Sequence, residues 1–316
     1  MLTRTAIVKS DKFIVETVEI PPVGDTTLLV RMLYSSVCDH MSDSIIRGST
    51  FSTDEGVGVV VEHGRETIGF HKDDRVVISR ALHGALCTNL FSEYVIVDQC
   101  MVSHVSPKIS NIEACILGCS VISGYAAVSH ILNPRPLSKY LVIGCNGTGL
   151  GALLTLNAYG ATNVDVADAS VYKIAYADRC NCGARIVSSC TSLDRKAKVI
   201  APYGYDMVVL CDTGTASLHE AIRCVSSRGV CLVLDPNIKD VLLESAIEPL
   251  NGKSVIFCSG NDIAPDDIIS SSTMCSIGQL PLYRCICNEL FDLSHLNELV
   301  SIVKEGVGGK LIVKCS

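Results

Sequence analysis

Charged residues are scarce in this chain, because Asp, Glu, Lys and Arg together make up only 19% of its 316 residues. That share is too small for a disordered or fibrous protein, whereas 48% of hydrophobic residues is enough to build sizeable cores. Lys and Arg number 26 against 33 Asp and Glu, and the sequence shows no basic run. The net charge of −7 would repel phosphate backbones and anionic lipid heads, so we expect neither a nucleic-acid nor a membrane partner.

Long apolar runs are also lacking. No segment approaches the ~20 uncharged apolar residues of a membrane-spanning helix, because Asp, Lys, Asn or Gly interrupts the longest candidates. The first 22 residues contain no apolar stretch of the kind found in a secretory signal. The sequence therefore predicts a cytoplasmic protein.

Cysteine, in contrast, is abundant. The 17 cysteines are odd in number and lie inside apolar runs such as CILGC, VVLC and GVCLVL. A free cysteine behaves as a small buried hydrophobic residue, so we expect most of them to be core thiols in a reducing compartment. The Cys-x-Cys pairs at 180/182 and 285/287 have a poor spacing for one zinc ion and are expected to be structural.

The pattern of apolar residues changes along the chain. Residues 1–120 contain short β segments separated by Gly, Pro and Asp, which predicts a β-rich unit. Over 121–260, apolar runs alternate with helical stretches, which is typical of a parallel sheet with helices on both faces. Within 261–316 the sequence predicts an amphipathic helix over 291–306 and a last strand, GKLIVKC, which we expect to return to the β-rich unit. The predicted fold class is α/β, with a doubly wound Rossmann domain and a second, β-rich domain.

A glycine-rich segment directly follows the apolar strand YLVI and opens a helix. It runs Gly144-Cys145-Asn146-Gly147-Thr148-Gly149, with Asn146 where a G-x-G-x-x-G motif has its second glycine. Glycines at these places allow a sharp turn and a close approach to a pyrophosphate, which the free N–H groups of a helix N-terminus can bind. The alternative is a turn that only joins a strand to a helix.

An acidic residue stands at the expected distance from this loop. Asp168 ends the next strand, 19 residues beyond Gly149, where a carboxylate can accept hydrogen bonds from the adenosine ribose hydroxyls. It would repel the 2′-phosphate of NADP, so the sequence favours NAD as the cofactor. Lys173, Asp212 and Thr213 are further candidates for cofactor contacts.

Several segments, taken together and in this order, resemble the zinc-type medium-chain dehydrogenase/reductase family, which includes the alcohol and polyol dehydrogenases. The resemblance covers nearly the whole chain, and its most specific segments are VCDHMSDSIIRG, EGVGVVVEHG, EACILGCSVISGYAAV, VIGCNGTGLG and GKLIV. It implies a GroES-like catalytic domain, split in sequence around the Rossmann domain.

The same resemblance implies a catalytic zinc ion. The family's ligands match Cys38, Asp54, Glu55 and Cys119, but Asp54 stands where the family has a histidine. Aspartate is itself an oxygen ligand for Zn²⁺, so Cys38, Asp54 and Cys119 could hold the ion, with Glu55 or water as the fourth ligand; the alternative is that the metal has been lost. The lobe that holds the family's structural zinc is missing, because only Cys87 lies in that interval. We therefore expect one zinc ion at most.

Three polar residues stand near the family's proton relay. His40 lies two residues after Cys38, and Ser42 and Asp43 follow it. An imidazole titrates near neutrality, so His40 could pass a proton from the substrate oxygen to water, and it could also ligate the metal. The alternative is a solvated loop histidine.

These observations predict an NAD-dependent oxidoreductase that interconverts a secondary alcohol, of the polyol, sugar or cyclitol type, with its ketone. Two alternatives remain: a zinc-free reductase of the same fold that acts on an activated C=C bond, and a noncatalytic nucleotide-binding protein. The segment SVIFC resembles the one through which the family often dimerises, so a homodimer is expected.

Overall fold

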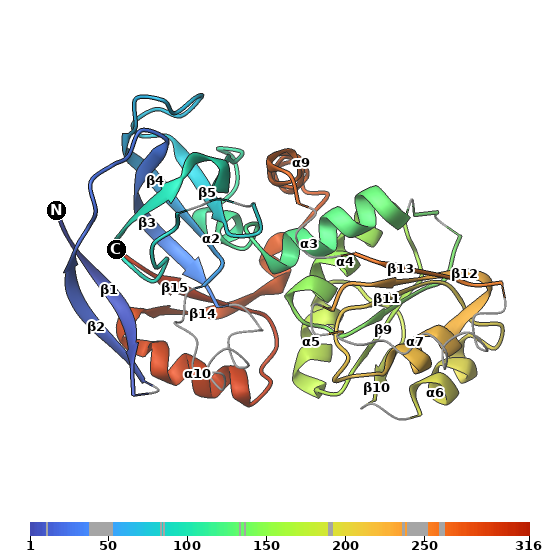
Figure 1. Cartoon of the computed structure of the whole chain (residues 1–316). Helices are drawn as coiled ribbons and strands as arrows, with labels where there is room; N and C mark the ends of the chain where they lie inside the picture. Colours follow the sequence, from blue (N-terminus) through green and yellow to red (C-terminus); the bar gives the residue numbers. More distant parts are fainter. Residues whose placement is uncertain are drawn as a thin grey trace. The chain divides into compact units, whose positions relative to one another are not determined.

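The computed structural model describes residues 1–316 except 11, 38–52, 83, 85, 133, 136, 189–191, 236–237, 239–251 and 259–262. The chain divides into two compact units (Figure 1). Unit 1 consists of Met1–Ile122 and Ile263–Ser316, and unit 2 of Ser123–Asp262. The α/β fold class predicted from the sequence is confirmed.

Unit 1 is built mainly of β-strands. Its strands are β1 (Leu2–Lys9), β2 (Lys12–Glu19), β3 (Thr27–Ser36), β4 (Glu55–His63), β5 (Arg75–Ser79), β6 (Tyr94–Asp98), β7 (Val102–His104), β14 (Ile286–Asp292) and β15 (Lys310–Lys314). Its helices and 3-10 turns are η1 (Gln99–Met101), α2 (Asn111–Cys115), α9 (Pro265–Ser276), η3 (Leu282–Cys285), η4 (Leu293–His295) and α10 (Leu296–Lys304), together with the start of α3 (Ser120–Ala127).

Strand β3 is the centre of unit 1. The main sheet has the order β14-β15-β3-β4-β5-β7, with β6 also paired to β3, while β1 and β2 form a separate hairpin. Strand β15, from the end of the chain, pairs antiparallel with β3, so Ile312 lies opposite Ser36. The apolar side chains of these strands enclose a core that Leu296 and Leu299 of α10 help to close. This pairing brings residue 310 beside residues of β3 and β4.

Unit 2 is a parallel sheet with helices on both faces (Figure 1). Its strands are β8 (Tyr140–Ile143), β9 (Val164–Asp168), β10 (Arg185–Val187), β11 (Tyr205–Leu210), β12 (Val225–Val233) and β13 (Ser254–Phe257). Its helices are most of α3, the π-helical turn η2 (Val128–Leu132), α4 (Gly147–Ala158), α5 (Val171–Arg179), α6 (Leu193–Ile200) and α7 (Leu218–Cys224). The strand order is β10-β9-β8-β11-β12-β13.

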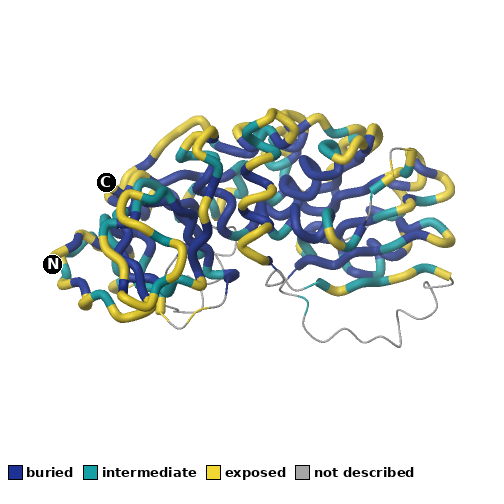
Figure 2. Tube along the Cα trace, turned by 90° about the horizontal axis from the view of Figure 1, so that it is seen from above, coloured by how far each residue is buried: buried dark blue, intermediate teal, exposed yellow. Residues whose placement is uncertain are grey.

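Burial explains why the central strands of unit 2 were recognisable as continuous apolar runs. All four residues of β8 are buried, and so are all five of β9. Figure 2 shows the buried strands inside each unit, with exposed residues concentrated in turns and on outer helices. Strands covered on both faces carry apolar side chains at most positions, rather than at alternate ones, and β9 departs from this only at its two buried aspartates, Asp165 and Asp168.

Three elements near the end of the chain differ from the sequence expectation. Helix α9 and strand β14 lie in a stretch where the pattern showed no regular element. The amphipathic helix expected over 291–306 begins only at Leu296, because Phe291 is buried in β14 and Asp292 caps a 3-10 turn by accepting from the Ser294 N–H at 2.8 Å. Local side-chain capping overrides the helical pattern there.

The described cysteines follow the expectation from composition. None of these residues forms a disulfide, and Cys100 alone among them is exposed. Burial raises the pKa of several thiols, as for Cys231, where it rises to about 12. Within the Cys-x-Cys pairs, Cys180 and Cys285 are buried. These thiols pack as hydrophobic side chains.

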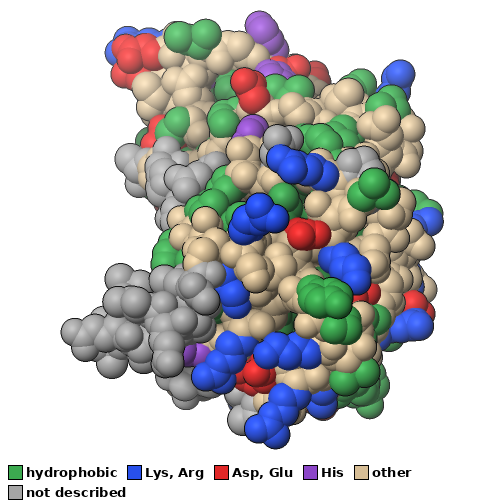
Figure 3. All heavy atoms as spheres, turned by 90° about the vertical axis from the view of Figure 1, so that its right-hand side faces the viewer, with side chains coloured by type: hydrophobic (Ala, Val, Ile, Leu, Met, Phe, Trp, Pro, Cys, Tyr) green, Lys and Arg blue, Asp and Glu red, His purple; other side chains and the backbone are tan. Residues whose placement is uncertain are grey.

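Surface charge is unevenly distributed over unit 2. Figure 3 shows Lys and Arg side chains gathered on one end of the unit, with few acidic ones between them. Arg195, Lys196 and Lys198, on α6, are exposed. Positive charge is thus locally concentrated in a chain of net charge −7. In the part of the chain that the structure describes, no helix is long and apolar enough to cross a membrane.

Candidate functional site

The loop between β8 and α4 has the geometry of a phosphate-binding turn. Gly144 leaves β8 with a φ of 93°, in the left-handed region that glycine adopts without strain. Asn146 is the N-cap of α4: its side-chain oxygen accepts from the Gly149 N–H at 3.0 Å, and its Nδ2 donates to the Cys211 carbonyl at 3.0 Å. The residue that departs from the glycine motif therefore caps the helix and ties the loop to the end of β11.

Two glycines of this loop allow a packing that no other residue would permit. A Cβ added at Gly149 would overlap the Gly144 carbonyl, and one added at Gly144 would lie 2.5 Å from the Asp212 Cβ. Helix α4 therefore starts in direct contact with the turn that precedes it. Its first turn carries no acidic residue and includes Gly147 and Thr148, both buried.

Asp168 is held against the same loop. It is 2% exposed, and its carboxylate accepts from the Cys145 N–H at 2.6 Å and from the Ser170 N–H at 2.7 Å. Burial raises the pKa of the Asp168 carboxyl, while these two N–H groups and the charge of Lys173 act to lower it. Two backbone donors thus fix the carboxylate at the carboxyl end of β9, next to the glycine loop.

The loop after β11 lies beside this group. Asp212 accepts from the Gly214 N–H at 2.9 Å and from the Thr215 hydroxyl at 3.0 Å. Thr213 donates its N–H and its hydroxyl to Asp235 Oδ2, each at 2.6 Å. Asp235 was missed by the sequence reasoning, although it follows the apolar strand VCLVL in the way that Asp168 follows β9.

These features fit a dinucleotide. A pyrophosphate binds at the N–H groups of a helix that starts close to its strand, and α4 starts in this way, after a loop whose glycines leave no room for a Cβ. An adenosine ribose needs an acceptor after the neighbouring strand, which is the place of Asp168. The predicted cofactor residues of unit 2 therefore lie at one edge of one sheet.

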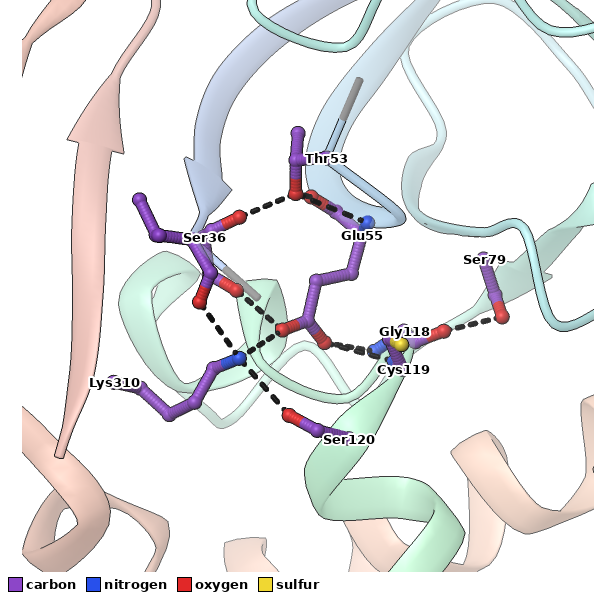
Figure 4. Close-up of polar contacts among 9 residues, drawn as sticks. Ser36, Thr53, Glu55, Ser79, Gly118, Cys119, Ser120 and Lys310 are labelled. Carbon is purple, nitrogen blue, oxygen red and sulfur yellow. Dashed lines mark hydrogen bonds and ion pairs between the residues drawn. The ribbon is translucent and has the colours of Figure 1, made fainter. Parts of the chain in front are cut away.

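Unit 1 contains a buried ion pair that links four segments of the chain (Figure 4). The Lys310 Nζ lies 2.7 Å from Glu55 Oε1, and the two side chains are 1% and 0% exposed. Lys310 also donates to the Val37 carbonyl at 3.1 Å and to the Ser120 hydroxyl at 2.9 Å. Its three N–H bonds are therefore all engaged.

Glu55 is as fully engaged as its partner. Oε1 accepts from the Ser36 hydroxyl as well as from Lys310, and Oε2 accepts from the N–H groups of Gly118 and Cys119 at 3.2 and 2.8 Å. These four bonds fill the roughly four acceptor positions of a carboxylate. A metal ion could bind Glu55 only by displacing one of these donors, so this arrangement does not fit the ligand role expected for Glu55.

The pair binds the backbone of Cys119 and of Val37, the residue before Cys38. Lys310 binds the carbonyl of Val37, the residue before Cys38, and Glu55 binds the N–H of Cys119. Ser79 adds a bond to the Gly118 carbonyl, and Thr53 one to the Ser36 carbonyl. The sequence reasoning did not single out Lys310, although its segment GKLIV was part of the family resemblance.

The other predicted metal and proton-relay residues are described only in part. Asp54 is half-buried and near Cys87: burial raises the pKa of the Cys87 thiol to about 11, Arg80 acts to lower it, and Asp54 raises it. Cys119 is half-buried. Cys38, His40, Ser42 and Asp43 lie outside the described residues. Among the residues that are described, no three His, Cys, Asp or Glu side chains form a group that could hold a metal ion.

The fold is that of the medium-chain alcohol dehydrogenases, with a Rossmann domain and a β-rich domain. No protein-family sequence model matches the chain. Its structure matches that of benzyl alcohol dehydrogenase from Acinetobacter calcoaceticus with a TM-score of 0.86 and 17% identity, covering 100% of both chains. An alcohol dehydrogenase zinc-binding domain protein from Burkholderia ambifaria gives a TM-score of 0.86 and 19% identity, over 100% of this chain and 99% of that one.

A third structure, 2R,3R-butanediol dehydrogenase from Bacillus subtilis, gives a TM-score of 0.80 and 20% identity, over 99% of this chain and 100% of that one. At these identities the likeness establishes the fold, and it confirms at that level the resemblance drawn from the sequence. The chemistry has to be argued from the chain's own residues.

Proposed function

We propose that this chain is an oxidoreductase that transfers a hydride between NAD and a secondary alcohol or the corresponding ketone. The observation that carries the proposal is the loop between β8 and α4, where an Asn-capped helix starts against Gly144 and Asp168 lies beside it. The likeness in fold to alcohol dehydrogenases supports the reaction class. The substrate class that we propose is a polyol, sugar or cyclitol.

In unit 2, we assign to the chain's own residues the task of holding the dinucleotide. The N–H groups at the start of α4 would bind the pyrophosphate, and Asp168 would accept from the adenosine ribose. When bound, NAD supplies the hydride acceptor, and the protein contributes orientation and proximity.

The first prediction concerns the choice of cofactor. NADH should bind at least about tenfold more tightly than NADPH, because the Asp168 carboxylate would face a 2′-phosphate of roughly −1.5 to −2 charge. Titration of the purified protein with each reduced cofactor, followed by fluorescence, measures both dissociation constants. Equal affinities for NADH and NADPH in the wild type would refute the cofactor assignment.

In unit 1, we propose a different role for Glu55 from that of a metal ligand. Together with Lys310 it is a positioning residue, because it holds the backbone of Cys119 and of the residue before Cys38. If zinc is retained, Cys38, Asp54 and Cys119 are its candidate ligands, and its chemistry would be to polarise the alcohol oxygen. His40, Ser42 or Asp43 would then carry the proton to water.

The second prediction tests the metal through Cys38. If Cys38 is a ligand, Cys38→Ser should strip zinc from the protein and abolish alcohol oxidation, while NADH affinity stays within about twofold of wild type. Zinc content, NADH affinity and the rate of oxidation of a secondary-alcohol panel are compared in wild type and mutant. Cys100→Ser is the matched control, because Cys100 is exposed.

Three results of this experiment separate the proposed functions. If Cys38→Ser loses both zinc and turnover while Cys100→Ser keeps both, the result supports the zinc-assisted reaction. Wild type that turns over without stoichiometric metal rules out the zinc mechanism and directs the search for a proton donor to His40 and Asp43. Tight NADH binding without turnover of any alcohol, ketone or activated alkene would refute the enzymatic proposal and identify a noncatalytic nucleotide-binding protein.

A further inference from the structure

Asp235 occupies a place in unit 2 to which the proposed reaction has so far assigned no role. It follows β12 by two residues and is 7% exposed. Strands β11 and β12 run parallel with Leu210 opposite Val233, so the loops after them leave the same edge of the sheet. Asp235 Oδ2 accepts both the N–H and the hydroxyl of Thr213 at 2.6 Å. The carboxylate therefore orders the loop after β11.

The strand order decides which half of a dinucleotide would lie near this loop. The pyrophosphate would bind at the start of α4, which follows β8. The adenosine ribose would bind at Asp168, the last residue of β9. Strand β11 lies on the other side of β8 from β9, and β12 lies beyond β11. The second half of the cofactor, which carries the nicotinamide ring, must therefore extend over the ends of β11 and β12, where Thr213 and Asp235 lie.

Two acidic side chains lie close to the end of β11. Asp212 and Asp235 both act on Cys211, which follows β11: burial raises the pKa of its thiol, and the charges of the two carboxylates raise it further. Thr213 donates to Asp235 from a neutral N–H and a neutral hydroxyl, so these two bonds hold the carboxylate without neutralising its charge. A nearby negative charge stabilises a cation and has little effect on a neutral group.

The two redox states of the nicotinamide ring differ in this respect, because the oxidised ring carries a positive charge and the reduced ring is neutral. We propose that Asp235, held by Thr213 and assisted by Asp212, is a specificity-determining residue that shifts the binding preference of this site toward oxidised NAD⁺. The inference rests on the proposed function, since it requires a dinucleotide in unit 2. A site biased in this way favours alcohol oxidation over ketone reduction at equal cofactor concentrations, because it is occupied by the hydride acceptor.

The test compares the dissociation constants of NAD⁺ and NADH in wild type and in Asp235→Asn. An asparagine oxygen can still accept from Thr213, so the loop is kept while the charge is lost. The ratio Kd(NAD⁺)/Kd(NADH) should rise roughly tenfold in the variant, since a charge pair in a partly buried site is worth a few times RT. Calorimetry gives both constants without any turnover.

A matched control removes a carboxylate charge at the amino ends of the strands, which is the end of the sheet opposite to Asp235. Asp206, at the start of β11, is exposed and accepts from the Lys139 N–H at 2.9 Å, so Asp206→Asn should leave the ratio unchanged. Where circular dichroism shows that Asp235→Asn has not folded, Asp212→Asn replaces it and should raise the ratio as well.

The possible outcomes separate the inference from the function on which it rests. A ratio that rises in Asp235→Asn and stays constant in Asp206→Asn supports the proposal. Equal losses of affinity for NAD⁺ and NADH mean that Asp235 only shapes the loop, and they overturn the proposal while leaving the cofactor assignment intact. Wild type that binds neither cofactor overturns both.

Discussion

Replacing Lys310 by methionine is expected to lower the free energy of unfolding by about 3–5 kcal/mol, because the change leaves the Glu55 carboxylate buried without its cation. Folded proteins are stable by only about 5–15 kcal/mol, so this is a large part of the total. Val37 and Ser120 would also lose the hydrogen bonds that they accept from Lys310. Urea unfolding followed by circular dichroism measures the loss.

Two further variants identify the cause of this loss. Lys314→Ala changes an exposed lysine on the same strand and should cost less than about 0.5 kcal/mol. The double variant Lys310→Met with Glu55→Leu removes both charges and should recover part of the stability, because replacing a buried ion pair by apolar groups is often neutral or stabilising. A Lys310→Met protein as stable as wild type would contradict the closed network of Figure 4.

Much of the fold could be predicted from the sequence because its signals are local. The strand YLVI, the glycine turn and the helix after it are adjacent in sequence, and β8 and α4 begin within a residue or so of the expected positions. Asp168 could be found for the same reason, since an acid at the end of an apolar strand is a local feature. Asp235 carries that same signal and could have been found with it.

The cluster around Glu55 could not be predicted in this way. Lys310 and Glu55 are 255 residues apart, and nothing near either residue indicates the other. They meet because β15 pairs with β3 and β3 pairs with β4, which is a property of the sheet as a whole. For this reason the sequence assigned Glu55 to a metal ion by family resemblance, whereas the structure shows its oxygens bound to an ammonium, a hydroxyl and two backbone N–H groups.

The strongest expected effect on cofactor binding comes from Gly149→Val. The first carbon of the new side chain would overlap the Gly144 carbonyl, so the turn and the start of α4 have to separate. The N–H groups that would hold the pyrophosphate then lose their common direction, and NADH affinity should fall by roughly 100-fold or more. Fluorescence titration with NADH, on samples whose fold is verified by circular dichroism, measures the effect.

The control for this change introduces the same side chain elsewhere in the same helix. Ala158→Val, in the last turn of α4, places the same β-branched side chain in the helix but lies far from the glycine turn along the helix, so NADH affinity should stay within about twofold of wild type. Should Gly149→Val fail to fold, Gly149→Ala supplies a smaller side chain with the same first carbon, and its affinity should still fall. A folded Gly149→Val protein with unaltered NADH affinity would mean that the pyrophosphate is not bound at the start of α4. The cofactor site would then have to be sought away from the carboxyl end of β8, because no shift of that turn could leave its N–H groups in place beneath a valine.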